Sequence, residues 1–202
     1  MRSHEKLKIS VLVSGGGTNL QSVIDHIESG YLDKAKIVRV ISSNCDAFAL
    51  KRAENHNIKG VCISKEMLPD PKERCAAIMK ELEAAGTDLI ILAGYMSILE
   101  PELIDRYRDK IVNIHPSLIP KYCGKGFYGR KVHAAVLAGN ELASGATVHF
   151  VDEGVDTGKI ILQEQVPVKP GDTPETLANR VLQIEHRILP EAIKMLCDGK
   201  LK

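Results

Sequence analysis

The sequence contains no tryptophan, and aromatic residues make up only 4% of its 202 residues. Aliphatic side chains must therefore fill most of the core, and a hydrophobic share of 44% is sufficient for a globular domain. No apolar run approaches the roughly 20 residues that cross a membrane, and residues 1–8 lack the apolar stretch of a signal peptide. We expect a cytoplasmic protein without a membrane partner.

The sequence also lacks an excess of charge of either sign. It contains 27 Lys and Arg residues and 26 Asp and Glu residues, which gives a formal net charge of +1. Proteins that bind nucleic acid usually carry a clear basic excess. The balance of charge gives no electrostatic basis for binding DNA or RNA, so we expect no nucleic-acid partner.

Cysteine and histidine residues are present, but their spacing is not that of a zinc site or of a disulfide framework. The five cysteines form no Cys-x-x-Cys pair, and the seven histidines form no His-x-x-x-His pair. We therefore expect no metal site and no disulfide framework. Reduced thiols are expected at Cys45, Cys62, Cys75, Cys123 and Cys197.

Along the first half of the chain, short apolar runs alternate with stretches that place apolar residues on one helical face. The runs predict strands at residues 7–14, 36–43, 60–64, 87–94 and 110–116. The stretches between them predict helices at residues 19–30, 46–57, 70–86 and 101–107. This order favours a Rossmann-like, mostly parallel sheet with helices on both faces.

The second half of the chain does not continue the regular alternation of predicted strands and helices. It predicts a loop, a helix, two antiparallel strands and a long helix, in that order, at residues 116–131, 131–139, 144–151, 159–168 and 171–199. No linker or repeat separates the two parts. We expect one α/β domain over residues 1–202, with halves at about 1–116 and 117–202.

A glycine-rich turn, SGGGTN at residues 14–19, joins the first predicted strand to the first helix. Glycines leave backbone N–H groups bare, and a helix start adds partial positive charge, so this turn is suited to an anion. No lysine follows the last glycine, which excludes a Walker A motif, and Leu20 breaks the dinucleotide fingerprint. A single phosphate monoester fits better than NAD, and a purely structural tight turn is the alternative.

Two polar residues, Asn113 and His115, lie on the fifth predicted strand before Pro116. Residues two apart on a strand point to the same side, and the carboxyl ends of parallel strands are where α/β sheets bind ligands. An amide can hold a developing oxyanion, and a histidine can donate a proton or stabilise charge. The pair suits attack on a carbonyl carbon, and a buried histidine bonded to backbone is the alternative.

A carboxylate would raise the pKa of such a histidine. The segment VDEGVDTG at residues 151–158 supplies three acids between two predicted strands, although an ordinary solvated turn has the same composition. Nucleophilic catalysis is disfavoured, because no Gly-x-Ser-x-Gly elbow occurs and neither Ser117 nor Cys123 has an activating context.

Three segments together, SGGGTNLQ, NIHPSLIPKY and HFVDEGVDTGKIILQ, resemble the folate-dependent formyltransferase family, and the resemblance extends over about residues 8–201. It implies an enzyme of purine biosynthesis that moves the formyl group of 10-formyltetrahydrofolate to the amine of 5-phosphoribosylglycinamide. Both compounds would be small-molecule partners, and no metal is implied. The first half of the chain would bind phosphate, and the second would bind folate and carry the catalytic loop.

The resemblance also assigns catalytic roles. Asn113 would hold the formyl oxygen, protonated His115 would stabilise the tetrahedral oxyanion, and Asp156 would raise the histidine pKa and order a water. Gly17, Thr18 and Asn19 would hold the substrate phosphate.

Further substrate contacts follow from the same resemblance. Glu185 would bind the ribose hydroxyls or the glycinamide end of the substrate, and Lys72 or Arg74 would meet the folate tail. The remaining folate contacts would come from Met96, Ser97, Ile98, Leu99, Asn113, Asp152, Glu153, Gly154 and Val155.

The sequence departs from its relatives at Ser97, where many carry a basic residue, at Cys123, where proline is frequent, and in the longer glycine-rich loop 121–131. A different folate-dependent formyltransferase, a formyl hydrolase and a non-catalytic phosphate-binding module are the alternative functions. Among the first, a tRNA formyltransferase would need a basic RNA-binding extension, and relatives that act on sugar nucleotides usually lack the glycine turn. A formyl hydrolase would need a regulatory domain, and we expect neither the extension nor this domain. The oligomeric state is expected to be a monomer or a homodimer.

Overall fold

The computed structural model describes residues 5–200, so the ends of the predicted domain, residues 1–4 and 201–202, lie outside it. The strands are β1 Leu7–Val13, β2 Ala35–Ser42, β3 Gly60–Cys62, β4 Leu89–Leu92, β5 Ile111–His115, β6 Ala143–Phe150 and β7 Ile160–Pro167. The helices are α1 Thr18–Glu28, α2 Phe48–Asn55, α3 Pro71–Ala84, α4 Pro101–Arg106, α5 Arg130–Ala138 and α6 Pro174–Cys197. Each predicted element is present, with ends that differ by a few residues.

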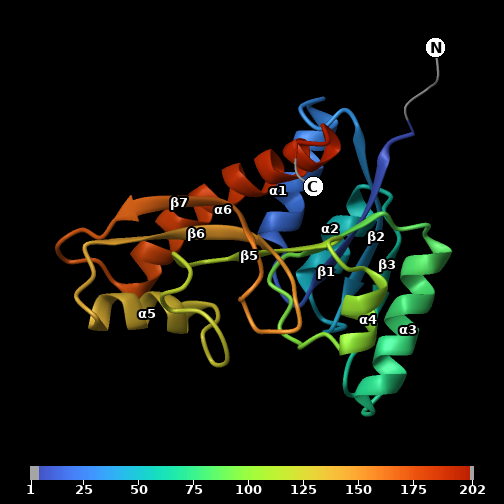
Figure 1. Cartoon of the computed structure of the whole chain (residues 1–202), viewed down its shortest axis with the longest axis horizontal. Helices are drawn as coiled ribbons and strands as arrows, with labels where there is room; N and C mark the ends of the chain where they lie inside the picture. Colours follow the sequence, from blue (N-terminus) through green and yellow to red (C-terminus); the bar gives the residue numbers. More distant parts are fainter. Residues whose placement is uncertain (1–4, 201–202) are drawn as a thin grey trace.

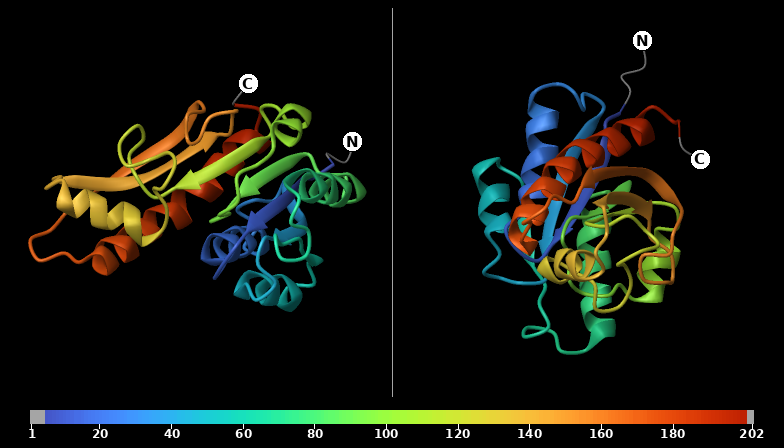
Figure 2. Two further views of the ribbon diagram at one scale, coloured as in Figure 1. Left: turned by 90° about the horizontal axis from the view of Figure 1, so that it is seen from below. Right: turned by 90° about the vertical axis from the view of Figure 1, so that its left-hand side faces the viewer.

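All seven strands form one sheet in the order β3-β2-β1-β4-β5-β6-β7 (Figure 1). The pairs from β3 to β5 are parallel, whereas β5–β6 and β6–β7 are antiparallel. Figure 1 and the left view of Figure 2 place β6, β7 and α5 at one end of the molecule and α2 and α3 at the other. The predicted Rossmann-like fold with antiparallel C-terminal strands and a long final helix is confirmed.

Alternation along the buried strands divides the core between the two sheet faces. On β1, Ile9, Val11 and Val13 pack into the cluster that includes residues of α1 and α6. Leu12 points the other way, into the cluster formed with α3 and α4. The near-continuous apolar run of β1 is thus explained by burial on both faces, as in other parallel sheets.

The final helix α6 ties the two halves together. Its N-cap Thr173 accepts a hydrogen bond from the Thr176 backbone N–H in a capping box, and Pro174 occupies the first turn. The helix packs against α1, α5 and β6, and Figure 1 shows it running from the antiparallel strands back to α1. Within residues 5–200 no helix has the length and apolar character needed to cross a membrane.

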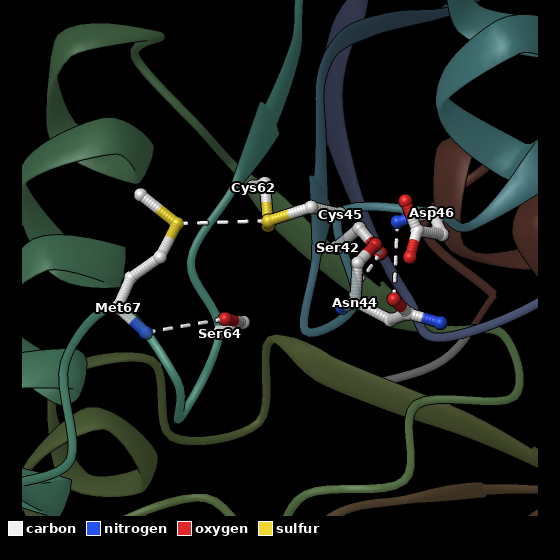
Figure 3. Close-up of a disulfide and its surroundings, with 7 residues drawn as sticks. All are labelled: Ser42, Asn44, Cys45, Asp46, Cys62, Ser64 and Met67. Atoms are coloured by element: carbon white, nitrogen blue, oxygen red, sulfur yellow. Dashed lines mark hydrogen bonds between the residues drawn. A yellow bond between two sulfur atoms is a disulfide. The ribbon is translucent and has the colours of Figure 1, made fainter.

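The expectation of five reduced thiols is wrong for two of them, because Cys45 and Cys62 form a disulfide (Figure 3). Strands β2 and β3 pair in parallel, so their carboxyl ends bring Cys62 beside the turn that carries Cys45. The two Cα atoms lie 5.1 Å apart, within the range that a disulfide spans. A separation of 17 residues hides this proximity in the sequence. The Sδ atom of Met67 lies 3.6 Å from the Cys45 sulfur.

Candidate active site

Strand β5 carries Asn113 and His115 on the sheet face opposite Val112 and Ile114, which belong to the core cluster beneath α1 and α6. On one side β5 pairs with β4 in parallel, and on the other it pairs with β6, antiparallel. The antiparallel register sets His149 directly opposite Asn113. Both strands therefore direct polar side chains to one face.

Asp156 lies against this polar pair, although it belongs to the loop between β6 and β7. One carboxylate oxygen, Oδ1, accepts a hydrogen bond of 3.3 Å from the Asn113 amide nitrogen. The other, Oδ2, lies 3.5 Å from Nδ1 of His115 and accepts a 2.9 Å bond from the Gly124 backbone N–H. The three side chains predicted as catalytic thus lie together.

His149 is a fourth member of this group and was missed in the sequence analysis. Its Nδ1 lies 2.8 Å from the carbonyl of Phe150, which can only accept, so Nδ1 carries the proton. Its Nε2 then accepts from the Asn113 amide nitrogen at 3.1 Å. Alternation along β6 would have placed His149 on the same face as Asn113 once the register between β5 and β6 was known. We call Asn113, His115, His149 and Asp156 the polar cluster.

The environment of His115 acts on its protonation in two opposing directions. Nε2 donates to the Tyr122 carbonyl at 3.0 Å, while Nδ1 faces the carboxylate of Asp156. An imidazolium would satisfy both acceptors. Burial nevertheless lowers the pKa of His115 below its usual value, and the raising effects of Asp156 and the Tyr122 carbonyl offset this only in part. Asp156 acts to raise the pKa of His115, as predicted, but the lowering effect of burial is larger.

Asp156 is held in its ionised form. Burial alone would raise the pKa of this carboxyl. The imidazole of His149, whose Nε2 lies 3.6 Å from Oδ1, the nearby imidazole of His115 and the Gly124 N–H act in the opposite direction and hold the pKa below its usual value. A carboxylate is therefore present beside His115 at neutral pH.

The glycine turn at residues 14–19 leads into α1 with the geometry of an anion site. Gly17 is the N-cap and has the left-handed φ of 71°, and no side chain caps the helix. The first turn contains no acidic residue, so its free N–H groups and the helix dipole are not neutralised locally. Open space surrounds Gly15 and Gly16 where side chains would stand. Thr18 is half-buried at the first helical position.

Asn19 and Glu185 come together although they are far apart in sequence. The Asn19 amide donates to the Glu185 carboxyl at 2.6 Å, and this contact joins α1 to α6. Burial raises the pKa of Glu185, and the hydrogen bond from Asn19 lowers it in part. The Asn19 side chain is thus directed to Glu185, and its backbone N–H remains in the first turn of α1.

Apolar side chains that were expected to meet folate are unusually exposed near the end of β4. Met96 is 52% exposed and Ile98 is 73% exposed, whereas Leu99 is buried in the core with α3 and α4. Val155, in the loop that carries Asp156, is 42% exposed. The Met96 backbone N–H donates to the Ser14 hydroxyl at 2.8 Å, which fixes this segment beside the glycine turn.

The other residues of the 152–156 loop shape the loop itself. Asp152 accepts hydrogen bonds from the Thr157 hydroxyl and the Gly154 backbone N–H. Glu153 is exposed and forms an ion pair with Arg108 at 3.2 Å. These contacts hold the loop in a conformation in which the Asp156 side chain lies against Asn113 and His115 on the sheet.

Only one of the two basic candidates from α3 lies beside the 95–99 segment. Arg74 lines a small pocket together with Tyr95 and Ser97 and donates to the carbonyls of Leu68 and Pro69. Lys72 is exposed and does not line that pocket. Within residues 5–200 no group of three or more His, Cys, Asp or Glu side chains is arranged to hold a metal.

The Rossmann-like sheet ends in antiparallel strands and carries a glycine turn and an Asn-His-Asp group at its carboxyl edge. The chain belongs to the formyl transferase family, because residues 7–193 match the formyl transferase domain.

The chain is also similar to individual proteins of known sequence and structure. The chain is 44% identical to phosphoribosylglycinamide formyltransferase of Haemophilus influenzae, over 96% of this chain and 89% of that protein. It is 40% identical to the trifunctional purine biosynthetic protein adenosine-3 of Drosophila pseudoobscura, over 100% of this chain but only 14% of that much longer protein. The crystal structure of glycinamide ribonucleotide transformylase 1 from Symbiobacterium toebii superposes with a TM-score of 0.93 at 39% identity and covers 100% of this chain and 92% of its own.

Proposed function

We propose that the chain transfers the formyl group of 10-formyltetrahydrofolate to the amine of 5-phosphoribosylglycinamide, a step of purine biosynthesis. The observation that carries the proposal is the convergence of Asn113, His115 and Asp156, with contacts of 3.3 and 3.5 Å, in a chain that also has an anion turn. Each part alone has a structural explanation, but a binding module has no need for all of them.

The polar cluster suggests how the transfer proceeds. The substrate amine attacks the formyl carbon, and negative charge develops on the formyl oxygen. Asn113 would hold this oxygen by turning one amide hydrogen away from its long contact with Asp156. His115 would stabilise the charge from Nδ1, because its Nε2 is occupied by the Tyr122 carbonyl. Collapse of the tetrahedral intermediate then expels the protonated folate nitrogen.

Asp156 would support this chemistry in two ways. Its charge favours the imidazolium form of His115, and one of its oxygens can order a water that carries the proton from the attacking amine to the leaving nitrogen. His149 would keep the amide of Asn113 oriented through its Nε2.

The substrates would bind on either side of this cluster. The glycine turn, with Gly17, Thr18 and Asn19, would hold the phosphate, and Glu185 would meet the ribose or glycinamide end. The exposed Met96, Ile98 and Val155 would cover the apolar faces of the folate co-substrate. Arg74 is preferred over Lys72 for the folate tail because it lines the pocket with Ser97.

A direct assay tests the proposal. The absorbance change on loss of the formyl group from 10-formyltetrahydrofolate should occur only when 5-phosphoribosylglycinamide is present. Turnover with water alone would indicate a hydrolase, and turnover only with a different amine would indicate a sister enzyme. We further propose a cytoplasmic location and a monomer or homodimer, which cell fractionation and sedimentation velocity would test.

A further inference from the structure

Helix α2 contacts the glycine turn through two hydrogen bonds. The backbone N–H of Ala49 donates to the Gly15 carbonyl at 3.1 Å. The Nε of Arg52, one helical turn further on, donates to the Gly16 carbonyl at 2.8 Å. Two successive carbonyls of the turn are therefore bound by α2.

These two bonds fix the direction of the N–H groups that follow. In a trans peptide the C=O and the next N–H point in opposite directions across the same plane. Because α2 holds the carbonyls of Gly15 and Gly16, the N–H groups of Gly16 and Gly17 point away from α2. A Cβ added at Gly15 or Gly16 would meet no atom within 4 Å, so no neighbouring side chain or backbone crowds these two residues.

Arg52 is itself held in place on several sides. Its Nη1 donates to the Gln21 side chain at 3.1 Å, and its guanidinium lies 5.0 Å from the ring centre of Phe48. A Cβ added to Gly17 would lie 3.5 Å from the Cδ of Arg52, so the charged side chain passes directly beside the turn. The neighbouring cation, Lys51, instead forms an ion pair with Glu54.

The charge of a phosphate monoester calls for more than the turn provides. Such a group carries about −1.5 to −2 at neutral pH, whereas a helix N-terminus offers only about +0.5. Arg52 adds a full positive charge, and a guanidinium suits phosphate better than an ammonium does. A residue that both orients the N–H groups and supplies charge would act specifically on the phosphate.

We propose that Arg52 is a positioning residue for the substrate phosphate, which it serves by anchoring the Gly16 carbonyl and by placing its charge beside Gly17. The inference rests on the proposed function for the identity of the substrate. It assigns α2 a role in recognition, in addition to its place in the core.

Arg52→Gln tests this assignment, and Lys51→Gln is the matched control, since it removes one positive charge from the adjacent position of the same helix. Two substrates are compared: 5-phosphoribosylglycinamide and the same compound without its phosphate. For Arg52→Gln we expect the KM for the phosphorylated substrate to rise about 10-fold to 100-fold, the loss typical of a hydrogen bond to a charged group. The kcat, and the kcat/KM for the phosphate-free compound, should stay within about twofold of wild type, and Arg52→Lys should recover part of the loss.

An equal loss with both substrates would overturn the proposal, because a merely structural role does not distinguish them. An equal rise in KM in Lys51→Gln would also overturn the proposal, since any positive charge on α2 would then have the same effect as Arg52. Calorimetric titration with inorganic phosphate separates this inference from the proposed function. If wild type fails to formylate the amine yet binds phosphate more tightly than Arg52→Gln does, the proposed function fails and the role of Arg52 stands. If wild type and Arg52→Gln bind phosphate equally tightly, Arg52 does not position the phosphate and the inference is wrong.

Discussion

The glycine turn and the polar cluster are two polar sites built on opposite principles. In the turn the groups that we propose to bind phosphate are backbone N–H groups, and their direction depends on the left-handed Gly17 and on the carbonyls that α2 holds. In the cluster they are side chains on β5, β6 and one loop. A backbone site should therefore be sensitive to an added Cβ, and a side-chain site to the loss of a functional group.

The largest effect is expected at His115, the side chain proposed to stabilise the charge that develops during transfer. His115→Ala should lower kcat by about 1,000-fold and change both KM values little, because the interaction of the imidazole grows in the transition state. Steady-state kinetics with both substrates measures this. Parallel losses in binding and rate would mean that His115 only maintains the structure, and the contrast between the two sites would disappear.

Asp156→Asn should have the next largest effect, a loss in kcat of about 100-fold. Asp156 raises the pKa of His115, so a neutral partner should lower that pKa further below its already reduced value. If the imidazolium is the active form, activity is present below this pKa and lost as pH rises through it. The alkaline fall of kcat/KM should therefore move to lower pH in the variant, and an unchanged profile would leave Asp156 a structural residue of its loop.

The backbone character of the turn is tested by one damaging and one harmless alanine. In Gly17→Ala the new Cβ would lie 2.6 Å from the Cβ of Ala49, and the φ of 71° is strained for alanine. Strain of about 1–3 kcal/mol that displaces α2 should raise the KM for the phosphorylated substrate roughly 10-fold to 100-fold. Gly15→Ala meets nothing within 4 Å and should stay within about twofold of wild type. Equal effects at both positions would contradict the backbone interpretation.

The smallest effect on activity is expected from loss of the disulfide that joins the β2–α2 loop to β3. Cys62→Ser removes the Cys45–Cys62 link, which closes a loop of 17 residues in sequence and should stabilise the fold by about 3 kcal/mol. Denaturant unfolding of the variant and of the chemically reduced wild type should show the same loss. Both should keep kcat within about twofold, since neither cysteine belongs to the turn or the cluster. A large fall in kcat would show that the turn depends on this link.

Local features of the chain were sufficient for most of the fold. The short apolar run of β1 and the one-sided apolar stripe of α1 need only neighbours in sequence, and both elements form as expected. The shared face of Asn113 and His115 follows from the period of a strand alone. The position of the glycine turn was predictable for the same reason, because consecutive glycines between a strand and a helix signal a turn, whereas the contacts with α2 that hold its carbonyls were not.

Contacts between distant segments were not predictable in the same way. The pairing register of β5 and β6 brought His149 opposite Asn113, and a loop that folds back over the sheet brought Asp156 to His115. Parallel pairing of β2 and β3 joined two cysteines that the sequence analysis treated as free.

The sequence by itself determined which residues are strands, helices and turns and which side chains share a face, because short-range sterics and hydrophobic periodicity depend on neighbours along the chain. Only the tertiary structure decided which faces meet. That choice is made by packing and loop closure over the whole sheet, as at Arg52, whose bond to Gly16 links helix α2 to a turn 36 residues earlier.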